Sequence, residues 1–232
     1  MSAAQPVIVA IDGPSGVGKS TAARLLAARL GVPYLETGAM YRALGIKALD
    51  CGVDPDDGQA VAALVAELSL DLTLTDDGEM IVLLDGRDVR PRIRGTAVSN
   101  ATSRVSVHAP VRTFMVELQR DWSRRRGAVV EGRDIGTRVF PQTPFKFFFE
   151  AAPAVRAARR FEQLRQAGDT ASTLAEVERQ VVERDARDRN RAESPLRRDD
   201  SYLAIDTGIA GPEEVVERML EHINARRPAP EA

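Results

Sequence analysis

Short apolar runs alternate with helical patterns at the start of the chain. Residues 7–13, "VIVAIDG", form a nearly continuous apolar run that predicts a buried strand. The segment "STAARLLAARLG" has a helical pattern, and Gly31 is placed to end it. "PYLETG" predicts a short second strand, and a further helix opens near "AMYRALGIKAL". The pattern therefore predicts strands and helices in alternation.

A β-rich island interrupts this alternation. The runs "LDLTL" (70–74) and "EMIVLL" (79–84) predict two strands, and Asp77-Gly78 between them suits a tight hairpin turn with positive φ. "DGRDVRPRI" supplies a third extended segment. We therefore expect residues about 66–96 to form a β insert in a larger fold.

The alternation resumes after the insert. We expect further strands at 128–134, 145–151 and 202–208, and helices at 96–107, 110–126, 153–166, 173–192 and in "PEEVVERMLEHI". Strands that are separated by helices favour a parallel sheet with both faces covered. The predicted fold class is α/β in a single domain, and residues 228–232 are expected to form a disordered tail.

Composition narrows the class of protein. The formal net charge is −2, so no overall field attracts nucleic acid or an anionic membrane. No apolar run reaches membrane-spanning length and the first residues lack a signal pattern, so we expect a soluble, cytoplasmic protein. A single cysteine, Cys51, excludes an internal disulfide.

Arginine dominates the basic residues. Lysine occurs only at Lys19, Lys47 and Lys146, which leaves 29 arginines among the 32 basic residues. Genomic base composition accounts for such an excess, but individual arginines can still serve as planar, permanently charged forks for phosphate. Position in the fold decides which ones do so.

One motif carries a specific chemistry. "GPSGVGKS", Gly13 to Ser20, matches G-x-x-x-x-G-K-[ST] between a predicted strand and a predicted helix. Glycines let backbone amides surround phosphate oxygens, and Lys19 can follow the charge of a transferring phosphoryl group. The Ser20 hydroxyl can bind Mg²⁺ or a water in its shell. The expected ATP-binding residues are Gly13, Pro14, Ser15, Gly16, Val17, Gly18, Lys19, Ser20 and Thr21.

The rest of the chain restricts the kind of nucleotide-binding protein. The guanine-reading pattern N-K-x-D is absent because no asparagine precedes a lysine. The chain is short for a large ATPase, and no apolar strand ends in an Asp-Glu pair. A small phosphotransferase with a lid and an acceptor pocket fits these observations best.

A charged helix near residue 180 shows an unexpected phase. Thr173 and Glu176 form a capping box that predicts the start of this helix, and it should stop near Ser194-Pro195. At about 100° per residue, the apolar side chains of the first turns form one buried stripe. They are Leu174, Val177 and Val181.

Charged residues continue this stripe. They are Arg184, Arg187, Asp188 and Arg191, whereas Glu183, Asp185 and Arg189 are predicted to face water. A purely solvated face would lie opposite the apolar stripe, so the helix should leave the core and border a cleft. Buried arginines need an anionic partner, and a phosphate-bearing ligand supplies one. An internal ion-pair network along the helix is the alternative.

Six segments then occur in one characteristic order and spacing: "IDGPSGVGKST", "ETGAMYRALG", "DVRPRIR", "VVEGRDIGTRVFP", "RDARDRNRAESPL" and "AIDT". In these segments the chain resembles the bacterial cytidylate kinases, which are nucleoside monophosphate kinases. The resemblance covers nearly the whole chain. It implies a P-loop NTPase-type three-layer fold with a five-stranded parallel sheet, an acceptor-binding lobe enlarged by the β insert, and a short lid.

The resemblance also implies boundaries within one kinase domain, residues 1–227. The core would comprise residues about 5–36 and 105–227, and the acceptor-binding lobe residues about 37–104. The lid would lie at about 160–172.

Roles of single residues follow from the same resemblance. The implied acceptor-binding residues are Thr37, Tyr41, Arg42, Ser103, Arg112, Arg133, Asp134, Arg184, Asp188 and Arg191. Among them, Arg42 and Arg133 would hold the acceptor phosphate, Asp134 the base, and Asp188 the ribose hydroxyls. Ser103 and Arg112 would read the cytosine ring. The implied catalytic residues are Lys19, Arg133, Arg159 and Arg191. The "GRD" stretch stands out without the resemblance, because it follows a buried strand where open α/β sheets bind ligands.

The implied activity is ATP-dependent phosphorylation of CMP and dCMP to CDP and dCDP, with Mg²⁺ as cofactor. The partners would be these small molecules, without nucleic acid or membrane, and we expect a monomer. One alternative is a kinase for another small acceptor, such as UMP or shikimate. Another is a P-loop regulatory or RNA-binding protein that only senses nucleotide, although the near-neutral charge counts against RNA.

Overall fold

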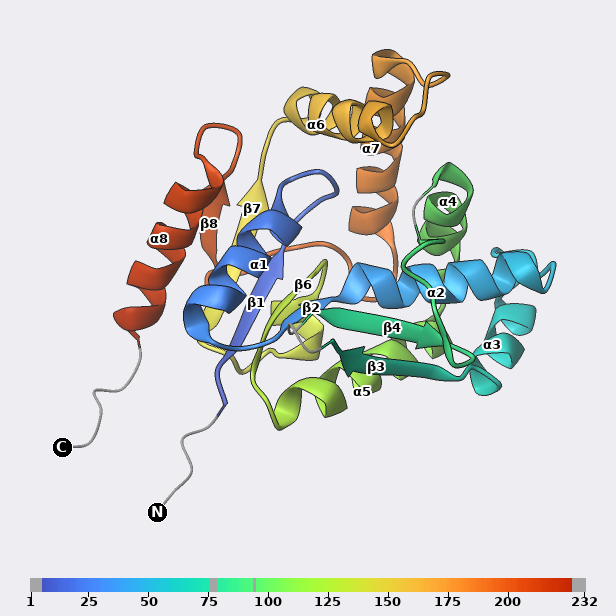
Figure 1. The fold of residues 1–232 in the computed structure, drawn as a ribbon, viewed down its shortest axis with the longest axis horizontal. Coiled ribbons are helices and arrows are strands. Elements are labelled where there is room, and N and C mark those ends of the chain that lie inside the picture. Colours follow the sequence, from blue (N-terminus) through green and yellow to red (C-terminus); the bar gives the residue numbers. More distant parts are fainter. Residues whose placement is uncertain (1–5, 76–78, 94, 227–232) are drawn as a thin grey trace.

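A five-stranded parallel sheet forms the centre of the protein (Figure 1). The computed structural model describes residues 6–75, 79–93 and 95–226. Along the sheet the strand order is β2 (Tyr34–Glu36), β6 (Ala128–Gly132), β1 (Ile8–Asp12), β7 (Phe145–Glu150) and β8 (Leu203–Asp206). The predicted parallel sheet and α/β class are confirmed. The predicted turn at Asp77-Gly78 and the tail 228–232 lie outside the described residues.

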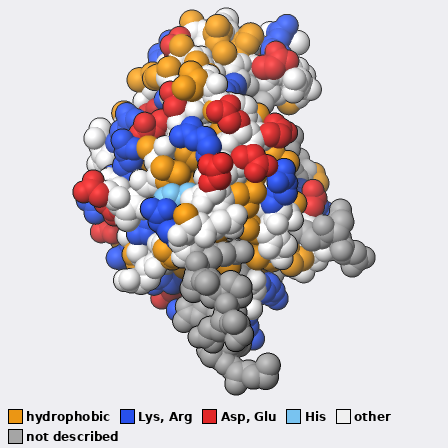
Figure 2. Space-filling view, turned by 90° about the vertical axis from the view of Figure 1, so that its left-hand side faces the viewer, with side chains coloured by type: hydrophobic (Ala, Val, Ile, Leu, Met, Phe, Trp, Pro, Cys, Tyr) orange, Lys and Arg blue, Asp and Glu red, His pale blue; other side chains and the backbone are white. Residues whose placement is uncertain are grey.

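The sheet separates two apolar cores, because side chains alternate along each strand. On β1, Val9 and Ile11 face the core that includes α1 (Lys19–Leu30) and α8 (Pro212–Asn224). Ala10 between them faces the opposite core. Both faces are therefore covered, which gives three layers. Over α8, the visible surface mixes acidic and basic side chains rather than carrying one sign of charge (Figure 2).

The second core continues into a lobe that is formed by the part of the chain between β2 and β6 in sequence. Its helices are α2 (Thr37–Asp50), α3 (Gly58–Ala66), α4 (Thr96–Val105) and α5 (Ala109–Arg124). Its antiparallel sheet has the order β3 (Leu70–Leu74), β4 (Met80–Leu84) and β5 (Arg87–Asp88), which confirms the predicted β insert.

Helix α3 was not predicted from the sequence. Its start was nevertheless signalled, because the Asp57 carboxylate accepts hydrogen bonds from the amides of Gln59 and Ala60, each at 3.0 Å. An aspartate in this place is a preferred helix N-cap.

Two packed helices lie beyond the C-terminal ends of the central strands (Figure 1). They are α6 (Pro153–Gln166) and α7 (Leu174–Asn190). The predicted capping box at Thr173 and Glu176 is present. Val177 and Val181 are buried, as predicted, and they pack with Ala157 of α6. Leu174 is 45% exposed, so its predicted burial was wrong: it lies on the first turn, at the margin of the stripe.

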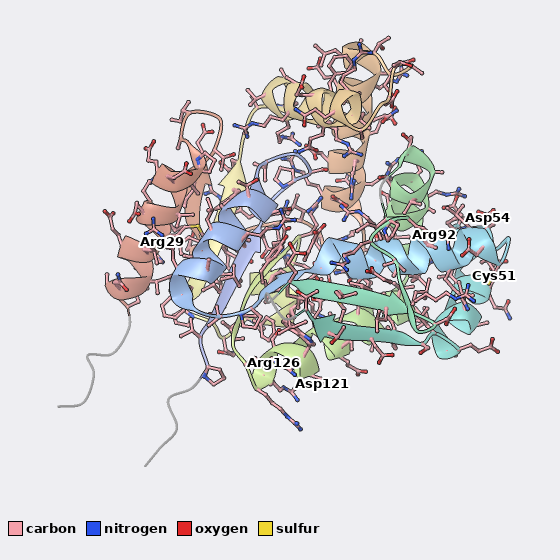
Figure 3. The ribbon with its side chains drawn as sticks, viewed as in Figure 1. Arg29, Cys51, Asp54, Arg92, Asp121 and Arg126 are labelled. Carbon is pink, nitrogen blue, oxygen red and sulfur yellow. The ribbon has the colours of Figure 1, made fainter. Side chains whose placement is uncertain are left out.

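The C-terminal end of α2 carries an exposed cysteine and several ion pairs. The free cysteine Cys51 is exposed just after the C-terminal end of α2, far from the start of this helix at β2 (Figure 3). Exposed ion pairs surround that end, such as Arg92 with Asp50 at 2.6 Å.

No helix in the described ranges is long and apolar enough to cross a membrane.

Close packing of α2 on α4 depends on Gly45. A Cβ atom at this position would lie 2.7 Å from the Thr102 hydroxyl and 3.1 Å from its backbone nitrogen. The hydroxyl cannot easily move, because it donates to the Val98 carbonyl at 2.6 Å. We predict that Gly45→Ala lowers the free energy of unfolding by about 1–3 kcal/mol, as overpacking commonly does.

Urea denaturation measures this change. Gly38→Ala on the same helix is the matched control, because its Cβ would lie at an ordinary 3.6 Å from the Arg42 guanidinium. A Gly45→Ala protein as stable as wild type would contradict the close contact of α2 with α4.

Candidate active site

The P-loop leads from β1 into α1 and holds a desolvated lysine. Gly16 and Gly18 have φ values of 75° and 88°, which glycine adopts readily. Lys19 begins α1, and its ammonium donates to the carbonyls of Gly13 at 2.9 Å and Pro14 at 2.8 Å. Burial lowers the pKa of Lys19 to about 7, and the charge of Arg133 acts in the same direction. An anion at this loop would stabilise the charged form.

A cleft of about 850 Å³ opens beside the P-loop. It brings together residues from the P-loop, α2, α4, α5, α6, α7 and the segment after β6. The expected site residues that line it are Ser15, Gly16, Val17, Gly18, Lys19, Ser20, Thr21, Thr37, Tyr41, Arg42, Ser103, Arg112, Arg133, Asp134, Arg159, Arg184, Asp188 and Arg191. Gly13 and Pro14 do not line the cleft and only accept hydrogen bonds from Lys19.

Helix α7 contributes a buried carboxylate to the cleft. Asp188 is 6% exposed and accepts a hydrogen bond from Arg133 Nε at 2.9 Å. Burial alone would raise the pKa of Asp188, but the charges of Arg133, Arg184 and Arg191 outweigh it and hold the pKa below its usual range. The Asp188 carboxylate therefore stays ionised at neutral pH. Nearby, burial lowers the pKa of Arg184 to about 10.

A second buried pair lies beside it. Arg112 Nη2 donates to Asp134 Oδ2 at 2.5 Å, and Arg191 Nη2 lies 3.7 Å from Asp134 Oδ1. The Arg112 guanidinium also stacks 5.6 Å from the centre of the Tyr41 ring. Asp134 thus presents a carboxylate in a pocket lined by planar cations and an aromatic face.

The other expected residues surround these pairs. Thr37 Oγ1 donates to the Glu131 carbonyl at 2.7 Å, and Arg159 Nη2 donates to the Thr207 carbonyl at 2.7 Å. Arg42 forms an ion pair with Glu36 at 2.6 Å, so a phosphate would have to compete with that carboxylate. The Ser103 hydroxyl accepts from Arg187 Nε at 3.1 Å, which joins α4 to α7.

Several buried guanidinium nitrogens lack a hydrogen-bond acceptor. Within the described part of the chain they are Arg112 Nε, Arg184 Nε and Arg191 Nη2. Buried polar groups are nearly always satisfied, so three such donors around one cleft indicate a polar, anionic ligand. These unpaired donors support the interpretation that the charged face of α7 borders a ligand-binding cleft, rather than forming only an internal ion-pair network. The Arg133–Asp188 pair shows that ion pairing also contributes.

Glu131 is a cleft residue that the sequence reasoning missed. Its Oε1 accepts from Ser20 Oγ at 2.5 Å and from the hydroxyl of Tyr34. Like Arg133 it lies at the carboxyl end of the buried strand β6, so the argument applied to "GRD" could have found it. In the described residues, no group of three acidic, histidine or cysteine side chains could hold a metal alone. A hydroxyl and a carboxylate still fit Mg²⁺, which takes most of its ligands from water and phosphates.

Asp12 fixes the segment that carries Arg133 and Asp134. Its carboxylate accepts from the amides of Ile135 and Gly136 and from the Tyr202 hydroxyl, each at 2.8 Å. These amides begin a five-residue π-helix, η1 (Ile135–Val139), which was not predicted from the sequence. Such turns often occur at functional sites. The hydrogen bonds hold the end of β6 to the end of β1.

Two predictions about the charged residues of α7 were wrong. Asp185 was expected to face water but is 5% exposed, and it forms a bidentate pair with Arg156. Helix α6 packs on this side of α7 and supplies the partner, which the phase of α7 alone could not show. Glu183 and Arg189 are exposed, as predicted. Arg187 was predicted to lie on the inward face but is exposed, so this prediction was also wrong.

Comparison with known proteins shows the family of this chain. The model of the family described as cytidylate kinase matches residues 9–225. The chain belongs to the cytidylate kinase family. It is 44% identical to a cytidylate kinase of Geobacillus kaustophilus over 95% of this chain and 97% of that protein. A cytidylate kinase of Shewanella denitrificans is 42% identical, over 94% and 96%.

Among solved structures, an uncharacterized protein from Eubacterium ventriosum has a similar fold. The TM-score is 0.53 at 12% identity, and the match covers 95% of this chain and 99% of that chain. At this identity the likeness concerns the fold alone. Membership of the cytidylate kinase family makes the chain an enzyme that uses ATP.

The buried Asp12 gives a prediction about pH. Burial raises the pKa of Asp12 to about 6 from its usual 3.8. Between these values the folded protein binds more protons than the unfolded chain, so this group's contribution to stability falls as pH rises through the window. Relative to Asp12→Asn, wild type should lose up to about 3 kcal/mol of unfolding free energy between pH 4 and 7.

Urea unfolding of both proteins at several pH values measures this difference. Asp71→Asn on the exposed side of β3 is the control for loss of a surface charge. Parallel stability profiles for wild type and Asp12→Asn would show that Asp12 does not titrate in this window.

Proposed function

We propose that the protein transfers the γ-phosphoryl group of ATP to CMP and dCMP, with Mg²⁺, by direct in-line transfer. The observation that carries this proposal is a single cleft with two different halves. One half is the P-loop with Lys19, and the other holds the Arg112–Asp134 and Arg133–Asp188 pairs. Membership of the cytidylate kinase family supports the choice of acceptor.

The donor half would bind the phosphates of ATP. P-loop amides and Lys19 meet the negative charge, and the low pKa of Lys19 means that a phosphate would draw a proton onto it. Ser20 and Glu131 would hold Mg²⁺ together with phosphate oxygens and water. When bound, the ion would neutralise charge on the donor phosphates.

The acceptor half has the donors and acceptors that a cytosine nucleotide needs. The Asp134 carboxylate can accept from the exocyclic amine of cytosine, while Ser103 and Arg112 can donate to the ring. Uracil has an oxygen in place of that amine, which would face the carboxylate unfavourably. The pocket therefore favours CMP over UMP.

Sugar and phosphate would meet the remaining charges. Asp188 would accept from ribose hydroxyls, and Arg42, Arg133 and Arg191 would neutralise the acceptor phosphate. Arg184 supplies a further buried donor, and Thr37 and Tyr41 also line the cleft. Arg159, from the predicted lid side, would approach the transferring group.

Transfer between two phosphates requires alignment rather than a general base. The attacking phosphate oxygen is already ionised, so the main barrier is repulsion between two polyanions. Buried arginines reduce that repulsion, and closure of the lobe at about 37–104 and the lid at about 160–172 would exclude water. We propose that one domain of this kind acts as a monomer.

Two alternative functions, a kinase for another acceptor and a nucleotide sensor, predict different behaviour. A kinase for UMP or shikimate would use the same donor half, but its acceptor would not need a carboxylate beside a stacked arginine. A nucleotide sensor would bind ATP without consuming it. Cationic side chains in both halves of one cleft favour transfer over sensing.

A panel of acceptors tests the proposed function. We predict that ADP release from ATP and Mg²⁺ depends on the acceptor and is fastest with CMP or dCMP, because only cytosine presents an amine to Asp134. A coupled assay with CMP, dCMP, UMP and shikimate measures this order. A faster rate with UMP or shikimate would refute the acceptor, and ATP binding without turnover would support the sensor.

Asp188→Ala tests the acceptor half. Removing this carboxylate also leaves Arg133 unpaired, so we predict that kcat/KM for CMP falls about 10- to 100-fold, the usual range for a hydrogen bond to a charged group. KM for ATP should change by less than about twofold. Glu183→Ala, which removes an exposed carboxylate from the same helix, is the control. Equal losses for both substrates would contradict a role confined to the acceptor.

A further inference from the structure

Arg156 joins three parts of the protein through one buried guanidinium group. It lies on the first turn of α6 and is 2% exposed. Its Nε donates to the Ala151 carbonyl after β7 at 3.0 Å, and its Nη1 donates to the carbonyl of Ser15 in the P-loop at 3.1 Å. Nη1 and Nη2 also donate to the two carboxylate oxygens of Asp185 on α7, at 3.1 and 2.6 Å.

The P-loop and α7 are both held at this point. A Cβ atom at Gly16 would lie 3.0 Å from the Arg156 carbonyl oxygen, so the loop backbone lies directly against α6. Asp185 is one residue from Arg184 and three from Asp188, which line the cleft. A shift of Asp185 would therefore move the acceptor side of the cleft relative to the P-loop.

Stability alone does not account for this pair. Burying two charges costs hydration, and apolar side chains of similar size often stabilise a fold equally well. Apolar side chains could not bond to the Ser15 carbonyl, nor would they fix an orientation as a planar bidentate fork does. The specific contribution of the pair is thus geometric.

We propose that Arg156 and Asp185 are positioning residues that keep the P-loop and α7 aligned, so that donor and acceptor phosphates meet in line. Neither side chain lines the cleft, so both act through their neighbours. This inference rests on the proposed phosphoryl transfer. A misplacement of about 1 Å away from the reacting atoms can reduce turnover about 100-fold.

Single variants provide the first test. Arg156→Lys keeps the charge but not the fork, and Asp185→Asn keeps the shape but not the charge. We expect kcat with ATP and CMP to fall about 10- to 100-fold in both. Glu183→Gln, which alters an exposed carboxylate on the same helix, should stay within about twofold of wild type. Single variants that stay as close to wild type as this control would overturn the proposal.

A double variant separates positioning from stability. In Arg156→Met/Asp185→Leu no buried charge is left unpaired, so the melting temperature should recover relative to the single variants. The bond to Ser15 is still absent, so kcat should remain low. Recovery of kcat together with the melting temperature would reduce the pair to a structural role. If the double variant does not fold, kcat of the two single variants, corrected for their folded fraction by circular dichroism, decides.

Wild type is assayed first. Without CMP-dependent ADP release the proposed function fails, and the positioning role with it. With normal release in wild type and unchanged kcat in the folded variants, only the positioning role fails.

Discussion

Buried arginine–aspartate pairs at the carboxyl edge of the central sheet hold the site together. Each pair joins elements that are far apart in the chain, because neither charge can be buried without the other. The pairs are Arg112–Asp134, Arg133–Asp188 and Arg156–Asp185. Together they link α5, the segment after β6, α6 and α7 around one cleft. The arrangement of side chains around the cleft depends on these contacts.

The cleft keeps an excess of cationic groups despite this pairing. Burial lowers the pKa of Lys19 to about 7 and that of Arg184 to about 10, so both charges are costly without a ligand. Buried guanidinium nitrogens without acceptors add to this cost. Two bound polyanions would relieve it, and this couples substrate binding to the electrostatics of the fold. A cytidylate kinase needs such a site, because its two substrates repel each other.

Much of this arrangement could be predicted from residues close together in the chain. The P-loop match needed only eight positions and a strand before them, and the phase of α7 placed Arg184, Asp188 and Arg191 toward a cleft. The role of Asp185 could not be predicted, because its partner Arg156 lies on α6. The way in which two helices pack cannot be deduced from the sequence of either helix alone. The π-helix after Asp134 was missed because it depends on the Asp12 side chain from another strand, whereas the place of Glu131 at the carboxyl end of β6 could have indicated it.

The sequence by itself determined the class of fold, the P-loop motif and the family, since each depends on local patterns and spacing. Apolar runs separated by helical patterns lead to a parallel sheet, and glycines with a lysine lead to phosphate binding. Only the tertiary structure decided which charges meet. Asp12 lies beside Gly136 and Tyr202, and Arg156 lies between the P-loop and Asp185, through contacts that span from 29 to 190 residues. Buried charges require partners, and in the folded protein these partners come from distant parts of the chain that the sequence alone does not bring together.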